Sequence, residues 1–444
     1  MRGADLRAAL AWLGGHVNYE VAAGGPPKAG STGGLSLERM SALVDVLDQP
    51  QHAYPVIHVT GTNGKGSVAR IASALLAESG LTVGTYTSPH LERVNERIAR
   101  NGEPIDDEDL AVVLGDLQHL EPLLGERPSY FELVTAAAFR WFADVAVDVA
   151  VVEVGLLGRY DATNVADGLV AVITNVGHDH SDFVDDWRER VAEEKAGIVK
   201  PGSTLVLGET DPELLPIFER AGAERTWYRD FDFGCERNEL AIGGRLLDLR
   251  TPGARYEEVF LPLHGAHQGD NAACAVAAVE AFFGAPVDEA VVETAFAAVR
   301  MPGRFEVMRR APLVVLDGAH NVEGAGVARA TLDEDFARGG ELILVLGVLE
   351  PRDPADLLGA LDADQAAMVI ACTAPSPNRT STAPWSAPSR WPARTTPCSS
   401  PGRCTSWAPP GRNWWATTAI TYVRRNEPHL RHGQARRRRA GPRR

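Results

Sequence analysis

Residues 55–79 have the sequence PVIHVTGTNGKGSVARIASALLAES, and this stretch indicates the fold. Residues 55–60 are a short apolar run, which predicts a buried β-strand. The turn that follows contains Gly61, Gly64 and Gly66. From Ser67 to Ser79 apolar residues recur at helical spacing, so a helix is expected there. A strand, a glycine-rich turn and a helix in this order are typical of a phosphate-binding loop in an α/β protein.

Further apolar runs on the C-terminal side predict a sheet with helices between its strands. Strands are expected at residues 81–87, 147–154, 170–176 and 204–207, with a helix at 131–145. Strands that alternate with helices form a mostly parallel sheet covered on both faces. Residues 228–261 are more polar and predict short strands with turns, and residues 271–283 predict an alanine-rich helix.

A second series of strands and helices begins after residues 301–304, Met-Pro-Gly-Arg. Its strands are expected at 313–316, 342–347 and 368–373, with a helix at 324–336. We therefore predict an α/β protein: a P-loop ATPase domain with a mostly parallel sheet (residues 1–302), followed by a smaller Rossmann-like α/β domain (residues 303–373).

The charge is distributed unevenly along the chain. Residues 373–444 contain 14 Arg and one acidic residue, Glu427, so residues 1–372 carry a formal net charge of −28 against −15 for the whole chain. An acidic surface of this kind repels phosphate backbones, which argues against nucleic-acid binding by residues 1–372. We offer a salt-loving host as a hypothesis for this acidity, against the alternative of an ordinary acidic enzyme.

Residues 374–444 differ in character from the rest of the chain. They are rich in Pro, Ser, Thr and Arg, and they contain five of the nine tryptophans without any period. Disordered segments seldom contain so many tryptophans. We favour a reading-frame error here as a hypothesis, and a basic tail for nucleic acid or membrane is the alternative.

Three further features bear on the location of the protein. Residues 1–13 lack the long apolar stretch of a signal peptide. No run of 18 apolar residues suggests a membrane span. The five cysteines are scattered without zinc spacing, which favours a reducing compartment. We expect a cytoplasmic enzyme with no membrane or nucleic-acid partner.

The strongest chemical motif is the glycine-rich turn, residues 61–67. Its glycines let backbone N–H groups approach phosphate oxygens closely, and the helix N-terminus adds positive potential. Lys65 is expected to reach the terminal phosphates of a nucleotide. The motif is one residue shorter than the common form if Gly61 is its first glycine.

Possible metal ligands follow two of the predicted strands. Glu153 lies at the end of the strand 147–154, and His178, Asp179 and His180 follow the strand 170–176. Parallel sheets place ligands at these ends, and oxygen-rich sites beside phosphates suit Mg²⁺. Lys195, among Glu193 and Glu194, is expected to be a surface lysine on a helix.

Taken together, these motifs resemble the folylpolyglutamate synthase/dihydrofolate synthase family of the Mur ligase superfamily. The resemblance covers residues 10–373. The matching stretches are, in order, residues 35–39, 61–67, 86–91, 95–97, 129–132, 153–164, 179–180, 194–202, Gln268 with Asn271, 302–306 and 317–321. The shorter P-loop is typical of Mur-type ligases.

The resemblance implies a role for each group of residues. ATP would be contacted by Asn63, Gly64, Lys65, Gly66, Ser67, Asn271, Arg304 and Asp317. Two Mg²⁺ ions would be held by Ser88, Glu153, His180 and a carbamylated Lys195, with Lys65, His180 and Lys195 acting in catalysis. The binding site for a pterin substrate would be lined by Gly33, Gly34, Leu35, Ser129, Tyr130, Phe131, Glu132, Tyr160, Asp161 and Ala162.

The implied reaction is the ATP-dependent joining of L-glutamate to dihydropteroate or a reduced folate. A carboxylate is a poor acyl donor, so ATP would first convert it to an acyl phosphate, which the glutamate amine then attacks. Closure of the two domains would exclude water from this intermediate. A monomer is the expectation from the family.

Two alternatives remain open: another Mur-type amide ligase acting on a different acid, and a non-catalytic nucleotide-binding remnant. Three positions also depart from the family pattern. Leu157 stands where the family usually has Gly, Tyr160 where Leu is frequent, and His178 where an apolar residue is usual. Leu157 and Tyr160 lie beside the proposed pterin loop, so they bear on substrate preference.

Overall fold

The computed structural model describes residues 5–20, 36–178, 186–310, 312–336, 340–348 and 353–372. The helices of these residues are α1 (Leu6–Leu13), α2 (Leu37–Val46), α3 (Lys65–Glu78), α4 (Asp107–Leu120), α5 (Tyr130–Asp144), α6 (Trp187–Ala196), α7 (Leu215–Glu219), α8 (His267–Phe283), α9 (Glu289–Ala298), α10 (Val322–Asp335) and α11 (Pro354–Ala360). In this part of the chain, no helix combines the length and apolar character needed to cross a membrane.

An eight-stranded sheet forms the centre of the molecule, in the order β4-β3-β2-β5-β1-β6-β7-β8. Its strands are β1 (Val56–Thr60), β2 (Val83–Tyr86), β3 (Ile98–Arg100), β4 (Glu103–Pro104), β5 (Val149–Glu153), β6 (Gly168–Ile173), β7 (Thr204–Leu207) and β8 (Arg225–Tyr228). The six strands from β2 to β8 in this order are parallel, and β3 and β4 are antiparallel. The predicted parallel sheet is confirmed.

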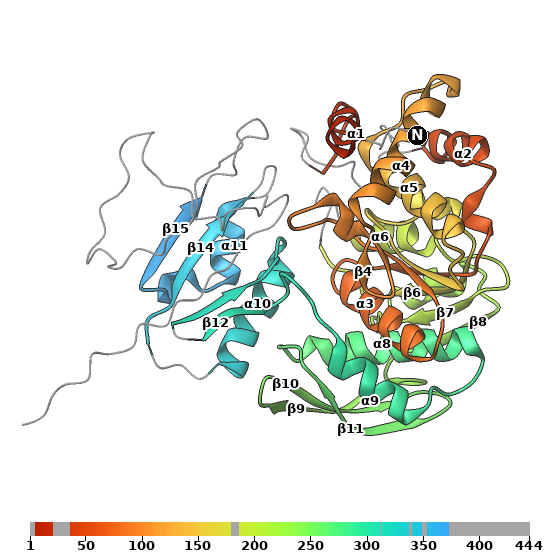
Figure 1. The fold of residues 1–444 in the computed structure, drawn as a ribbon. Helices are drawn as coiled ribbons and strands as arrows, with labels where there is room; N and C mark the ends of the chain where they lie inside the picture. Colours follow the sequence, from red (N-terminus) through yellow and green to blue (C-terminus); the bar gives the residue numbers. More distant parts are fainter. Residues whose placement is uncertain are drawn as a thin grey trace, which may run out of the picture.

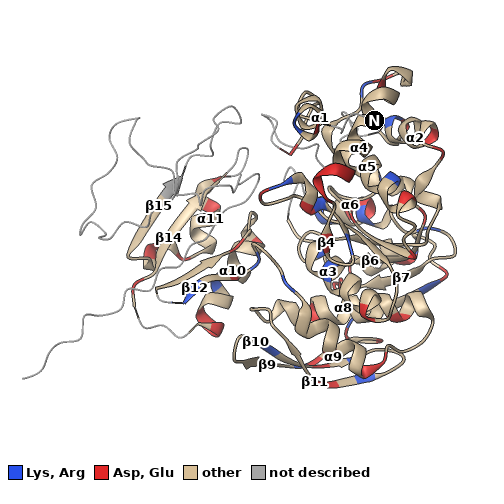
Figure 2. Cartoon of the chain, in the orientation of Figure 1, with Lys and Arg blue, Asp and Glu red and all other residues tan. Residues whose placement is uncertain are grey.

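Helices cover both faces of this sheet because its strands are buried on both sides (Figure 1). On one face, alternate residues such as Ile57 and Val151 pack against α3 and α8. On the other face, Ala150 and Val152 pack against α5, and Ile173 packs against α6. The strands of the sheet are largely uncharged, and charged residues gather on helices and loops (Figure 2).

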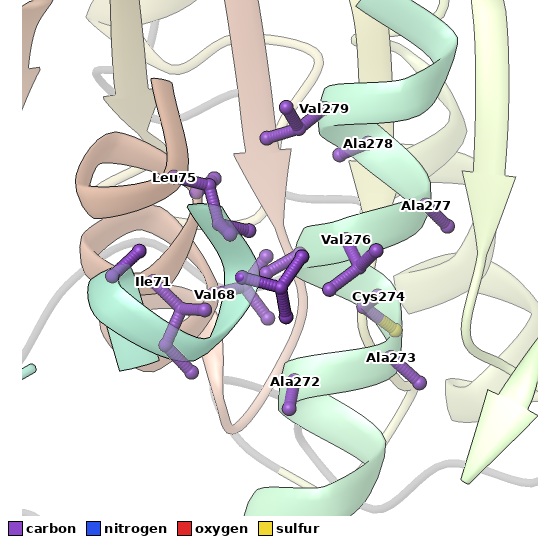
Figure 3. Close-up of a cluster of buried hydrophobic side chains, with 14 of the residues drawn as sticks. Val68, Ile71, Leu75, Ala272, Ala273, Cys274, Val276, Ala277, Ala278 and Val279 are labelled. Carbon is purple, nitrogen blue, oxygen red and sulfur yellow. The ribbon is translucent and has the colours of Figure 1, made fainter. Parts of the chain in front are cut away.

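The contact between α3 and α8 joins the P-loop helix to the alanine-rich helix. Val68, Ile71 and Leu75 of α3 belong to the same buried cluster as Ala272 and Val276 of α8 (Figure 3). Small side chains on α8 allow the two helices to approach closely, so larger apolar residues of α3 fill the space between them. Beyond α8 and α9 lies a three-stranded antiparallel sheet, β9 (Gly234–Ala241), β10 (Gly244–Arg250) and β11 (Arg255–Leu261).

Residues 303–372, called here the C-terminal part, build a separate hydrophobic cluster that begins at Phe305. Its elements are the hairpin β12 (Glu306–Arg310) and β13 (Leu313–Leu316), helices α10 and α11, and the parallel pair β14 (Ile343–Gly347) and β15 (Met368–Cys372). The expected strands and helix of this series are confirmed to within two residues. The division into domains at residue 303 stays a prediction, and residues 374–444 lie outside the described residues.

Candidate active site

Two glycines of the P-loop hold conformations that no other residue could adopt there. Gly61 has φ 151° and Gly64 has φ 84°. A Cβ atom on Gly61 would lie 1.7 Å from Thr174 Oγ1, and one on Gly64 would lie 2.3 Å from Asn271 Oδ1. The bare backbone can therefore approach an anion, and α3 begins directly behind it at Lys65.

Two residues after β6 hold the P-loop in place. Asn175 Oδ1 accepts hydrogen bonds from the backbone N–H groups of Thr62 (3.2 Å) and Asn63 (2.9 Å). Thr174 Oγ1 donates to the carbonyl of Asn63 at 2.6 Å. Neither Thr174 nor Asn175 was predicted to have a role, although their position at the end of a predicted strand that follows the P-loop in the sequence was a usable signal.

Lys65 lies at the loop as predicted. Its Nζ donates to the carbonyl oxygens of Gly61 (2.9 Å) and Thr62 (3.1 Å), so the ammonium group is folded over the glycine turn. A phosphate bound to the loop would meet this charge, which offsets negative charge on a transferring phosphoryl group.

Glu153 ends β5, as expected, and its carboxylate lies against the P-loop, where a Cβ atom on Gly66 would be 3.4 Å from Oε2. It is 4% exposed, and one carboxylate oxygen accepts from the backbone N–H of Ser88 at 3.0 Å. Burial raises the pKa of Glu153, while the positive charges of Lys65 and Arg304 act against this rise. A buried carboxylate among phosphate-binding groups suits a bound cation.

The structure brings together two of the four metal ligands that the resemblance implies, Ser88 and Glu153. His180 lies outside the described residues. Within the described ranges, no group of three His, Cys, Asp or Glu side chains could hold a metal ion. Glu153 and its neighbours nevertheless fit Mg²⁺, because oxygen donors beside a phosphate site are what this ion prefers.

The prediction of Lys195 as a surface lysine is wrong. Lys195 is 3% exposed on α6, because the loop of residues 155–161 covers that helix. Gly158 lies so close that a Cβ atom there would be 2.6 Å from the carbonyl of Glu194 and 3.1 Å from Lys195 Cα. Charge patterns along a helix do not reveal a loop that packs over it. This burial agrees with a functional role for Lys195.

The C-terminal part meets the P-loop at Asn321. Asn321 Nδ2 donates to Asn63 Oδ1 at 3.0 Å, although 258 positions separate the two residues. Asp317, in the same part of the chain, accepts from the backbone N–H groups of Phe305 (3.0 Å) and Ala319 (2.8 Å). Arg304 lies close enough to Glu153 to affect its pKa. The residues implied for ATP therefore converge from both parts of the chain.

The residues implied for the pterin divide into two kinds. Ser129 and Glu132 form a capping box at the start of α5, and Arg39 Nε also bonds Glu132 at 3.1 Å. Asp161 is 3% exposed and accepts from the backbone N–H groups of Leu156 (2.8 Å) and Thr163 (3.0 Å). These polar groups are engaged in holding helix and loop together, which is a structural role.

Tyr130, Phe131 and Tyr160 are the more accessible of the described members of this set. Phe131 packs on Gly155, where a Cβ atom would lie 2.3 Å from its ring. Tyr160 is 38% exposed, and Ala162 is buried. Gly33, Gly34 and Leu35 lie outside the described residues.

A buried charge cluster that the sequence analysis did not assign lies beside Tyr130. Arg97, 0% exposed, donates to both carboxylate oxygens of Glu20 at 2.9 and 2.6 Å and to His90 Nδ1 at 2.8 Å. Its guanidinium lies 5.7 Å from the centre of the Tyr130 ring. Burial and the charge of Arg97 lower the pKa of His90 to about 4. The pairing of Glu20 with Arg97 has no local sequence signal, because 77 positions separate them.

Family models match both parts of the chain. The Mur ligase middle domain matches residues 126–279, and the Mur ligase, glutamate ligase domain matches residues 303–389. The chain is 42% identical over 351 residues to the dihydrofolate synthase/folylpolyglutamate synthase of Mycobacterium tuberculosis, covering 74% of this chain and 72% of the relative. The protein belongs to the dihydrofolate synthase/folylpolyglutamate synthase family.

Solved structures agree with this assignment. Mycobacterium tuberculosis folylpolyglutamate synthase complexed with ADP has a TM-score of 0.76 and 38% identity, with 84% of each chain covered. An "FPGS-AMPPCP-folate complex" has a TM-score of 0.74 and 29% identity, with 84% of this chain and 90% of that chain covered. The protein is therefore an ATP-dependent ligase of the Mur ligase fold that acts on small molecules.

Proposed function

We propose that this ligase joins L-glutamate to dihydropteroate, to a reduced folate, or to both. The observation that carries the proposal is the convergence of the P-loop, Glu153 and the C-terminal residues Arg304 and Asn321 on one place. Such a place can hold a nucleotide and a carboxylate substrate together, and the names of the relatives supply the class of substrate. Phe131, which packs on Gly155, and Tyr160, within the loop 155–161, are the residues proposed to contact the pterin.

The proposed reaction has two steps. An oxygen of the substrate carboxylate attacks the γ-phosphorus of ATP, so that an acyl phosphate forms and ADP leaves. The amine of glutamate then attacks the acyl carbon, phosphate leaves, and the amine loses a proton. Lys65 offsets the charge on the transferring phosphoryl group. The hydrogen bond between Asn63 and Asn321 joins the P-loop to the C-terminal part and helps to keep the reacting groups in position.

We also propose two Mg²⁺ sites, one made by Ser88, Glu153 and His180 and a second in which a carbamylated Lys195 is a ligand. A cation there would neutralise negative charge on the phosphates. Two features support the sites: Glu153 is buried with a raised pKa, and Lys195 is buried rather than solvated. Carbamylation would turn the lysine into an anionic ligand, and intact-protein mass after bicarbonate treatment would show whether that adduct forms.

The test is ADP release by the full chain with ATP, Mg²⁺, dihydropteroate and L-glutamate, each omitted in turn, at low and high KCl. We expect turnover that requires all three substrates. The same assay with tetrahydrofolate in place of dihydropteroate shows which of the two acids the enzyme accepts. ADP binding without glutamate-dependent turnover would reject the ligase and leave a nucleotide-binding remnant.

A further inference from the structure

A buried ion pair holds the C-terminal end of helix α10, the end far from the P-loop. Arg245 of β10 donates from Nη1 to Asp335 Oδ1 at 2.9 Å and from Nη2 to Glu334 Oε1 at 2.8 Å. The side chains of Arg245 and Asp335 are 1% and 0% exposed. This ion pair joins the three-stranded sheet to the C-terminal part, and water cannot compete for it.

The remaining polar atoms of this pair also have partners. Asp335 Oδ2 accepts from the backbone N–H of Gly265 at 2.8 Å and lies 3.2 Å from His264 Nδ1. Arg245 Nε donates to Asn238 Oδ1 at 2.8 Å. A buried ion pair is held in one geometry when its other hydrogen bonds are satisfied, since any shift leaves a buried charge without a partner. The C-terminal end of α10 is therefore fixed.

The N-terminal end of α10 lies at the active site. Asn321, its N-cap, donates to Asn63 of the P-loop, and Glu323 Oε1 accepts from the backbone N–H of His178 at 3.0 Å. Gly177, next to His178, also exchanges hydrogen bonds with Thr62 Oγ1 at 2.9 and 3.1 Å. Glu323 is exposed, so this contact is weak and cannot hold the helix against the P-loop alone.

We propose that Arg245 and Asp335 are positioning residues for the ligase reaction. By fixing the far end of α10, they hold Asn321 and Glu323 against the P-loop and the Gly177–His178 segment. The helix has 14 residues and spans roughly 20 Å at about 1.5 Å per residue, and a hydrogen-bonded rod of this length transmits the position of one end to the other. The inference rests on the proposed function for its kinetic consequence, but its structural consequence is measurable without turnover.

The test removes both charges together in the variant Arg245→Met with Asp335→Asn. Neither charge is then left buried alone, and the amide oxygen of Asn can still accept from Gly265. Hydrogen–deuterium exchange should show faster exchange of the His178 amide in the absence of substrates. We expect kcat to fall about tenfold, as for the loss of a charge-assisted hydrogen bond, with a change in KM for L-glutamate below about threefold.

A matched control removes an arginine–carboxylate pair from the same small sheet without touching α10. Arg237 Nη2 donates to Glu239 at 2.8 Å on β9, and both side chains are partly exposed. The variant Arg237→Met with Glu239→Gln should leave the His178 amide and kcat within about twofold of the parent, as expected for a surface pair. If this control changes both readouts as strongly, the effect belongs to the sheet in general and the proposal is wrong.

Arg245→Lys is the second variant should the double variant fail to fold. Lysine keeps the charge but not the two-nitrogen contact with the carboxylates, so a smaller increase in His178 exchange is expected. Unchanged exchange at His178 in a folded variant, or unchanged kcat alongside faster exchange, would overturn the proposal. If the parent chain shows no glutamate-dependent ADP release, the ligase proposal fails, whereas the exchange comparison still decides whether the far end of α10 controls the near end.

Discussion

The Glu153 carboxyl group lies at a place from which the fold largely excludes water. Burial raises its pKa above the unfolded value, so the folded protein binds that proton more tightly than the unfolded chain does. The protonated carboxyl favours folding at low pH, and this contribution is lost as pH rises through the folded-state pKa. Above that pKa the buried carboxylate therefore destabilises the fold, and a bound cation would offset this cost.

We predict that Glu153→Gln stabilises the metal-free protein near pH 8 but not near pH 4. Glutamine keeps an oxygen that can accept from the Ser88 N–H and carries no charge to bury. Thermal unfolding in EDTA at the two pH values measures the effect, and the melting temperature of the variant should exceed that of the parent only at the higher pH. An equal difference at both values would show that the charge of Glu153 is not the cause.

Leu157 is one of three positions at which the sequence was expected to depart from the pattern of the family it resembles. Its φ is 56°, a left-handed conformation that costs a non-glycine residue roughly 1–2 kcal/mol. The side chain is 7% exposed and packs in a cluster with Val154 and Ile173. Burying a leucine contributes about 1.5–3 kcal/mol, so packing offsets the backbone strain. The substitution is therefore compatible with the fold of the loop beside Tyr160.

At the scale of the element, helix α5 depends on its first turn. Ser129 Oγ accepts from the N–H of Glu132 at 3.2 Å, and the Glu132 carboxylate accepts from the N–H of Ser129 at 2.6 Å. This reciprocal pair satisfies two backbone donors at the buried start of the helix. Phe131, proposed to contact the pterin, lies within the same turn.

We predict that Ser129→Ala lowers the free energy of unfolding by about 1 kcal/mol, the usual cost of losing an N-cap, and raises KM for the pteroate substrate by shifting Phe131. Urea denaturation and steady-state kinetics measure the two effects. Asp288→Ala is the matched control, because Asp288 caps α9 through the N–H of Ala290 at 2.9 Å and contacts no proposed substrate residue. The Asp288→Ala variant should lose a similar free energy of unfolding and keep its KM for the pteroate substrate. If its KM rises as much as that of Ser129→Ala, the rise comes from lower overall stability and not from a shift of Phe131.

At the scale of the whole molecule, residues 1–372 carry a formal net charge of −28. Figure 2 shows acidic residues on helices and loops of both parts of the molecule. Charges of one sign repel one another across the surface, and salt weakens this repulsion, since the Debye length falls from about 10 Å at 0.1 M to about 3 Å at 1 M.

We predict that raising KCl from about 0.1 M to about 2 M increases the melting temperature by several degrees, because screening removes repulsion that destabilises the compact state. Differential scanning calorimetry across a KCl series measures this. An uncharged osmolyte at equal osmolality is the control and should give a smaller increase. A flat or falling melting temperature in KCl would refute the view that acidity is an adaptation to salt.

The sequence by itself determined the local features of this protein. The glycine turn, the helix behind it and the apolar strands are set by backbone freedom and residue periodicity, which act over a few positions. The position of Glu153 at a strand end followed from the same local pattern. These features were enough to predict the parallel sheet and the P-loop, and the order of the motifs gave the family.

Only the tertiary structure decided which distant groups meet. It buried Lys195 under the loop 155–161, placed Asn175 on the P-loop and joined Asn63 to Asn321 across 258 positions. The ion pair of Arg245 with Asp335 likewise connects residues 90 positions apart. Such contacts depend on how whole elements pack against one another, and no local periodicity encodes that packing.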